Sequence, residues 1–190
     1  VEKYRFLPKG GSFKNRMNVA TDCKIILYLG RIDKAKGIDF LIKAFYYMLR
    51  QYPPLRQVLL VIAGPDFGYL SSLKILSRNL GISDKVLFLE FIPERIKKAV
   101  LTDADIVVNV EPYNAYGLVP LEAAACGTPV IVSKNNGIAS LVKAGSFGFS
   151  VTYGDVDKLA YYMYLLLSDE HLREKLGKQG RNFVLSKLSW

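Results

Sequence analysis

Residues 25–37 read IILYLGRIDKAKG, and this stretch decides the fold. It opens with Ile25–Leu29, five residues without a charge among them. A strand that is apolar on both faces is typical of a parallel sheet covered by helices on both sides. Gly30 and Gly37 permit tight turns at the two ends of the loop that follows. The stretch therefore predicts a buried parallel strand with a loop at its carboxyl end.

The rest of the chain repeats this pattern of strands and helices. Further strand candidates are Val58–Ala63, Val86–Phe91, Ile106–Val110, Val130–Val132 and Gly148–Val151. Apolar residues at helical spacing lie at 38–49, at 70–80 before Gly81, at 159–167 after an N-cap at Asp155, and in a last helix from Ser168 onward. Strands that alternate with helices predict the α/β class, as a Rossmann-like doubly wound parallel sheet.

Length and composition limit the classes of protein. The 190 residues, 51% of them hydrophobic, suffice for one well-buried domain, and we place it at residues 25–190 after a linker or domain entry at residues 1–24. Two cysteines give no disulfide framework, which favours a reducing, cytoplasmic location. No apolar run reaches the ~18 residues of a membrane-spanning helix.

The net charge of +9 favours anionic partners such as phosphorylated ligands or an acidic membrane surface. A solvated basic surface is the alternative. Nucleic acid is disfavoured, because the chain has neither zinc-ligand spacing nor an aromatic RNA-binding signature.

The loop after the first strand carries two cations. Ligands of open parallel sheets bind at the carboxyl ends of the strands, and Arg31 and Lys36 follow the first of them. A guanidinium and an ammonium group on one loop suit a diphosphate, although lysines of this kind are also common on ordinary surfaces.

A helix start follows the fourth strand. Pro120 fits the first turn of a helix, so the free amides of Gly117, Leu118 and Val119 face the rim, where the helix dipole favours an anion. A carboxylate at Glu122 is unfavourable beside an anion unless it serves hydrogen-bond donors, such as sugar hydroxyls. A glutamate stabilised by the helix dipole is the alternative interpretation.

These segments together resemble a known family. The segments that carry the resemblance are Gly30–Asp39, which fits G-R-x-x-x-x-K-G, Val61–Gly64, Val86–Leu89, Asp103–Val108, Tyr116–Ala123 and Cys126–Val130. As an ordered set, they resemble the retaining GT-B glycosyltransferases called glycosyl transferases group 1. The resemblance covers the chain from about Lys24 onward.

The resemblance implies two Rossmann-like domains with the active site between them, and it makes this chain the C-terminal, donor-binding half. The last helix, near Trp190, would be truncated before it crosses to the missing N-terminal domain. Carried over residue by residue, the catalytic positions are Arg31, Lys36 and Asn114, and the donor-binding positions are Gly30, Leu89, Ile92, Tyr116, Gly117, Leu118, Val119 and Glu122. Within these, Glu122 would hold the ribose hydroxyls, and Leu89–Ile92 would lie near the nucleobase.

The chain departs from the family at one catalytic position. Asn114 stands where the family usually has a glutamate, and Glu111 is nearby but out of register. An amide can exchange hydrogen bonds with sugar hydroxyls but offers no negative charge. We therefore expect Asn114 to contact the donor sugar without acting as a charge; a simple turn residue is the alternative.

The expected activity is that of a hexosyltransferase in glycan biosynthesis. It would transfer the sugar of a UDP- or GDP-linked donor, with retention, to an acceptor glycan or lipid, and would need no metal or other cofactor. This half alone would be inactive. A non-catalytic nucleotide-sugar-binding module or regulatory subunit, and a basic domain that docks on the cytoplasmic face of an anionic membrane, are the alternatives.

One possible metal-binding motif lies at the wrong end of a predicted strand for an active site. Asp103 and Asp105 fit the D-x-D pattern of metal-dependent glycosyltransferases, but they precede a strand and so belong to the opposite edge of the sheet. We expect both carboxylates to be structural.

Overall fold

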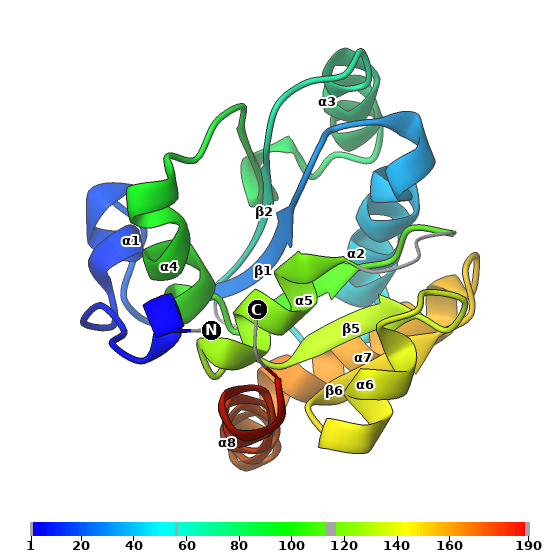
Figure 1. Ribbon diagram of the computed structural model, residues 1–190. Helices are drawn as coiled ribbons and strands as arrows, with labels where there is room; N and C mark the ends of the chain where they lie inside the picture. Colours follow the sequence, from blue (N-terminus) through cyan, green and yellow to red (C-terminus); the bar gives the residue numbers. More distant parts are fainter. Residues whose placement is uncertain (1, 56, 113–116, 189–190) are drawn as a thin grey trace.

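A parallel sheet of six strands forms the centre of the molecule (Figure 1). The computed structural model describes residues 2–55, 57–112 and 117–188. The strand order is β3-β2-β1-β4-β5-β6, and every neighbouring pair is parallel. The strands are β1 Lys24–Leu29, β2 Val58–Ala63, β3 Val86–Leu89, β4 Ile106–Asn109, β5 Val130–Ser133 and β6 Gly148–Val151. The order and direction confirm the Rossmann-like doubly wound fold.

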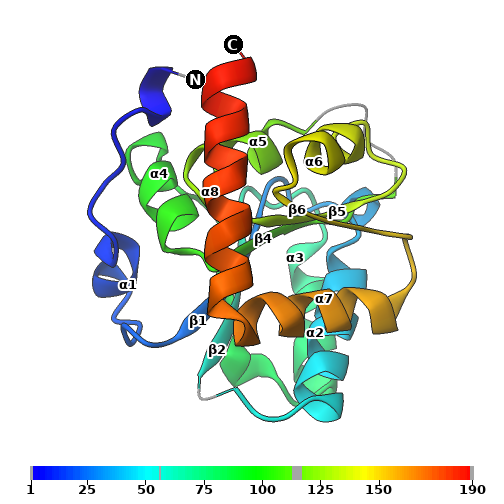
Figure 2. The same cartoon turned by 90° about the horizontal axis from the view of Figure 1, so that it is seen from below.

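Helices cover both faces of this sheet. Figure 2 shows α2, α3 and α7 on one side and α4, α5 and α6 on the other. The helices are α1 Ser12–Arg16, α2 Ile38–Gln51, α3 Leu70–Asn79, α4 Glu94–Asp103, α5 Leu118–Ala125, α6 Ala139–Gly145, α7 Val156–Ser168 and α8 Glu170–Lys187, with 3₁₀ turns η1 Glu2–Tyr4, η2 Lys34–Lys36 and η3 Ser83–Lys85.

The continuous apolar strands follow from this layering. In β1, Ile26 packs into the core under α2 and α7, whereas Ile25 and Leu27 pack into the core under α4 and α5. All three side chains are fully buried. Because successive side chains of a strand point to opposite faces, a strand between two helical layers needs apolar residues at every position.

Residues 2–23 pack on the domain. Tyr4 and Phe13 are buried in the core on the α4 and α5 side, and α1 lies against α4. Arg181 of α8 donates hydrogen bonds to the carbonyl oxygens of Tyr4 at 3.1 Å and Arg5 at 2.9 Å. The segment predicted as a linker or domain entry therefore contributes to the core, and the domain boundary at residue 24 stays a prediction.

Some element boundaries differ from the sequence predictions. The last helix begins at Glu170 and not at Ser168, because the carboxylate of Asp169 accepts the amide hydrogen of Leu172 at 2.8 Å and so serves as its N-cap. β3 ends at Leu89, two residues before the predicted end at Phe91. The predicted N-cap Asp155 is confirmed, since its carboxylate accepts the amide hydrogen of Lys158 at 3.0 Å.

Candidate functional site

A small pocket lies where the strand order of the sheet reverses. The chain leaves β1 toward β2 on one side and returns to β4 on the other, so a crevice is expected at the carboxyl ends of β1 and β4. A pocket of about 150 Å³ occupies this place. Its lining comes from the ends of both strands, from η2 and from the start of α5: Tyr28, Leu29, Gly30, Arg31, Lys36, Asn109, Glu111, Gly117 and Val119.

Close backbone contact holds the Arg31 loop in place. Gly64 has a φ of +146°, and a Cβ there would lie 1.8 Å from the carbonyl oxygen of Gly30. The loops after β1 and β2 are also hydrogen-bonded, since the Ile32 amide donates to the Pro65 carbonyl at 2.8 Å. The guanidinium of Arg31 lies over the Phe67 ring, 5.0 Å from its centroid. The chain thus presents Arg31 at the rim from a fixed backbone.

A second glycine brings Lys36 to the end of β4. Gly37 has a φ of +68°, and a Cβ there would lie 2.7 Å from the carbonyl oxygen of Val110. Through this close approach, the ammonium group of Lys36 donates a hydrogen bond to the carboxylate of Glu111. The Glu111 side chain is only 3% exposed and that of Lys36 is 22% exposed, so the ion pair is largely shielded from water.

Tyr28 forms part of the same pocket wall. Its hydroxyl donates a hydrogen bond to the carbonyl oxygen of Arg31 at 2.8 Å. Burial, reinforced by the negative charge of Glu111, raises the pKa of Tyr28 above its usual value. The phenol therefore stays protonated and keeps this hydrogen bond.

The start of α5 supplies backbone donors. Gly117 is the N-cap residue and has an extended backbone. As a glycine, it has no side chain that could accept a hydrogen bond from the amides of the first turn. Gly117 and Val119 line the pocket, whereas the Leu118 side chain is 56% exposed. First-turn amides without an intrahelical partner, together with the helix dipole, favour an anion at this position.

The structure therefore unites part of the predicted site. Gly30, Arg31, Lys36, Gly117 and Val119 line one pocket. Leu89 and Ile92 are partly buried and pack against the core on the α4 side, and neither lines this pocket. Asn114 and Tyr116 lie outside the described residues, as does Trp190.

Glu122 lies apart from the pocket. Its carboxylate is on the α4 side of α5, 2.7 Å from the ammonium of Lys97 and 3.8 Å from that of Lys3. The residue is only 4% exposed. The predicted contact of Glu122 with ribose hydroxyls stays a prediction.

Four of the described pocket residues were not predicted as site residues: Tyr28, Leu29, Asn109 and Glu111. The amide oxygen of Asn109 accepts a hydrogen bond from Asn136 at 3.2 Å, which ties β4 to the loop after β5. Polar side chains at the carboxyl end of an otherwise apolar strand were the available signal for Asn109 and Glu111.

The aspartates of the D-x-D pattern are structural, as predicted. The Asp103 carboxylate accepts the amide hydrogens of Gly11 at 2.7 Å and Phe13 at 2.6 Å, so it fixes the start of α1. Asp105 accepts the amide hydrogen of Ile25 at 2.8 Å, at the amino end of β1. Within residues 2–55, 57–112 and 117–188, no group of three or more histidine, cysteine, aspartate or glutamate side chains could hold a metal ion.

Cys126 is a core residue, as expected. It is 6% exposed, and burial raises the pKa of its thiol to about 11. In the same described ranges, no helix has both the length and the apolar composition needed to cross a bilayer.

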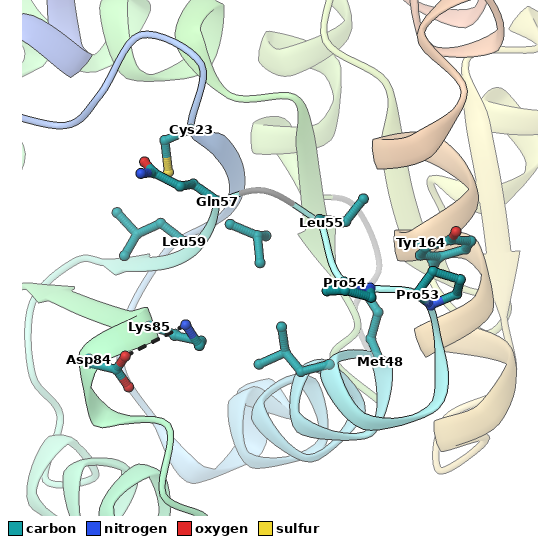
Figure 3. A pocket seen from close by; sticks show the side chains of 12 residues that line it. Cys23, Met48, Pro53, Pro54, Leu55, Gln57, Leu59, Asp84, Lys85 and Tyr164 are labelled. Carbon is teal, nitrogen blue, oxygen red and sulfur yellow. Dashed lines mark ion pairs between the residues drawn. The ribbon is translucent and has the colours of Figure 1, made fainter.

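A larger pocket lies at the opposite edge of the sheet. It measures about 380 Å³ and lies between the end of α2, the start of β2 and η3 (Figure 3). Its lining is mostly apolar, with Met48, Pro54 and Leu59 among it, and it includes none of the predicted site residues. The exposed Asp84–Lys85 pair lies at its margin. The cations that suit a diphosphate lie in the smaller pocket, so the candidate site is the smaller one.

Known proteins share this sequence and this fold. The family model described as glycosyl transferases group 1 matches residues 12–183. An uncharacterized glycosyltransferase of Methanocaldococcus jannaschii is 35% identical over 179 residues, which are 94% of this chain and 45% of that protein. The chain thus spans about half the length of the curated relatives it matches.

Solved structures also share the fold of this chain. Sucrose-phosphate synthase from Thermosynechococcus elongatus has a TM-score of 0.85 at 30% identity, over 99% of this chain and 46% of that one. HepE of Anabaena, in complex with UDP-glucose, has a TM-score of 0.78 at 27% identity, over 92% of this chain and 47% of that one. The chain belongs to the glycosyl transferases group 1 family and has the fold of its GT-B C-terminal domain.

Proposed function

We propose that this chain binds the nucleotide-diphosphate sugar of a glycosyltransferase in the pocket between the ends of β1 and β4. The observation that carries the proposal is the convergence of Arg31, Lys36 and the first amides of α5 on one pocket at the strand reversal. Two cations and the backbone donors at the start of a helix match the oxygens of a diphosphate. The UDP-glucose in the complex of HepE, a structural neighbour, supports this class of ligand.

The proposed mechanism of sugar transfer follows from the negative charge that develops on the leaving diphosphate. The bond between the sugar C1 and the diphosphate oxygen breaks, and the new bond joins C1 to the acceptor oxygen on the same face of the sugar. The diphosphate takes up the proton of the acceptor hydroxyl, so no protein nucleophile is needed. Arg31, Lys36 and the α5 amides stabilise the negative charge on the leaving diphosphate. We propose that this transfer proceeds with retention and without a metal ion.

The acceptor would bind to a second domain. Among the described residues, the large apolar side chains exposed at the carboxyl edge of the sheet include Phe67 after β2, Phe91 after β3 and Leu118 at the start of α5, at 54%, 73% and 56%. Exposed apolar residues gathered at one edge suit a surface that another domain covers. We propose an N-terminal domain there, with an acceptor glycan or lipid between the two.

The test is the stereochemistry of donor cleavage. The chain joined to its proposed N-terminal domain should split UDP-glucose or GDP-mannose, whichever it binds, slowly with water in the presence of EDTA. Proton NMR recorded before mutarotation should first show the sugar anomer of the donor. Release of the opposite anomer, or a strict need for magnesium or manganese, would contradict the proposed mechanism.

The matched control is the 190-residue chain alone. It should bind the donor and release no sugar, because half of the proposed cleft is absent. A non-catalytic nucleotide-sugar-binding module is the second candidate, favoured by Asn114 at the position where the family carries a glutamate. Binding without cleavage by the two-domain protein would support it.

A further inference from the structure

The pocket proposed for the diphosphate contains a carboxylate. Glu111 lies two residues after the end of β4, is 2% exposed and lines the pocket together with Arg31 and Lys36. Its carboxylate accepts a hydrogen bond from the Lys36 ammonium. The side chains that line this pocket therefore carry two positive charges and one negative charge.

This carboxylate opposes a bare diphosphate in two ways. It repels the phosphate oxygens, and little water screens its charge because its side chain is only 3% exposed. It also holds one of the three hydrogens of the Lys36 ammonium, which the diphosphate must share. A pocket selected only for tight binding of a diphosphate would have a neutral residue here.

A sugar attached to the diphosphate changes this balance. Its hydroxyl groups are hydrogen-bond donors, and an ionised carboxylate is an acceptor that makes stronger hydrogen bonds than a neutral group. The donor sugar is tethered to the phosphate that Lys36 binds, so its hydroxyls are within reach of the same pocket wall. The contact that a hydroxyl makes with Glu111 offsets the repulsion of the diphosphate.

We infer that Glu111 is a specificity-determining residue that favours the intact nucleotide sugar over the spent nucleoside diphosphate. The inference rests on the proposed function and adds a residue role to it. After transfer, the sugar leaves with the acceptor, and the negative charge of the carboxylate then repels the diphosphate with no sugar contact to offset that repulsion. Glu111 thereby weakens the binding of the product nucleoside diphosphate while it strengthens the binding of the substrate nucleotide sugar.

The test compares each nucleoside diphosphate with its nucleotide sugar on Glu111 variants that remove or keep the negative charge. Dissociation constants of UDP and UDP-glucose, and of GDP and GDP-mannose, are measured by calorimetry for the parent, Glu111→Gln, Glu111→Ser and Glu111→Asp. Both neutral variants should lower the ratio of the nucleoside diphosphate constant to the nucleotide-sugar constant by about tenfold. Glu111→Asp keeps the charge and should hold the ratio within about threefold of the parent.

Controls separate this inference from a structural role. Glu174→Gln, the same chemical change in an exposed i,i+4 pair with Lys178 on α8, should leave the ratio unchanged. If Glu111 only holds Lys36 in place, the neutral variants shift both constants by one common factor, and the unchanged ratio overturns the inference. A parent that binds none of these four ligands, nor ADP or an ADP-linked sugar, overturns the proposed function itself. Thermal melting of each variant shows that it is folded.

Discussion

Replacing Gly64 by alanine should cost roughly 3 kcal/mol or more of the free energy of unfolding. The Cβ would lie 1.8 Å from the Gly30 carbonyl oxygen, so one of the two loops must move. The φ of +146° adds strain, because side chains rarely adopt it. For a chain of this size, the loss corresponds to a fall in Tm of about 6–12 °C, measured by thermal denaturation.

Gly68→Ala is the matched control for this effect. Gly68 also has a positive φ, of +87°, but a Cβ there meets nothing within 4 Å. It should therefore report the backbone strain alone, about 1 kcal/mol. Equal losses at the two positions would show that the contact between Gly30 and Gly64 does not hold the Arg31 loop.

Lys36→Ala should weaken the binding of nucleoside diphosphates by 100-fold or more, and Arg31→Ala by about 10–100-fold. Each charge-assisted contact is worth roughly 1.5–3 kcal/mol. The Lys36 variant loses more because it also removes the positive charge that lies between the buried carboxylate of Glu111 and the diphosphate, which increases their repulsion. Calorimetric titration of the parent and both variants measures the difference.

Lys34→Ala is the control, since it removes the same charge from the same loop. Lys34 is exposed and does not line the pocket, so its loss should change the affinity by less than threefold. Similar losses at Lys34 and Lys36 would mean that the positive charge acts diffusely and that the pocket is not the anion site.

The centre of the sheet could be predicted from the sequence because its strands are buried on both faces. Val58–Ala63 is bounded as predicted, since Gly64 and Pro65 end the apolar run. The edge strand Gly148–Val151 is also bounded as predicted, although three of its four residues are only partly buried. The folding of residues 2–23 could not be predicted. Tyr4 and Phe13 are held by contacts with residues far along the chain, such as Asp103 and Arg181, and leave no local periodicity.

The candidate site was predictable where it depends on loops after strands. Arg31, Lys36 and Gly117 follow β1 or precede α5, so topology alone brings them to one rim. The ion pair between Lys36 and Glu111 depends on the approach of Gly37 to the backbone of Val110, which only the fold shows. The position of Glu122 likewise depends on Lys97, which comes from another helix.

The most direct measurement is a thermal-shift and calorimetric panel of UDP, GDP, ADP and their sugars against the 190-residue chain. At least one nucleoside diphosphate or nucleotide sugar should bind, and at 100 times its dissociation constant it should stabilise the chain by about 2.7 kcal/mol. That raises Tm by about 5–10 °C. Absence of binding and of stabilisation by every member of the panel at millimolar concentration would contradict the assignment of the pocket between β1 and β4 as a nucleotide-sugar site.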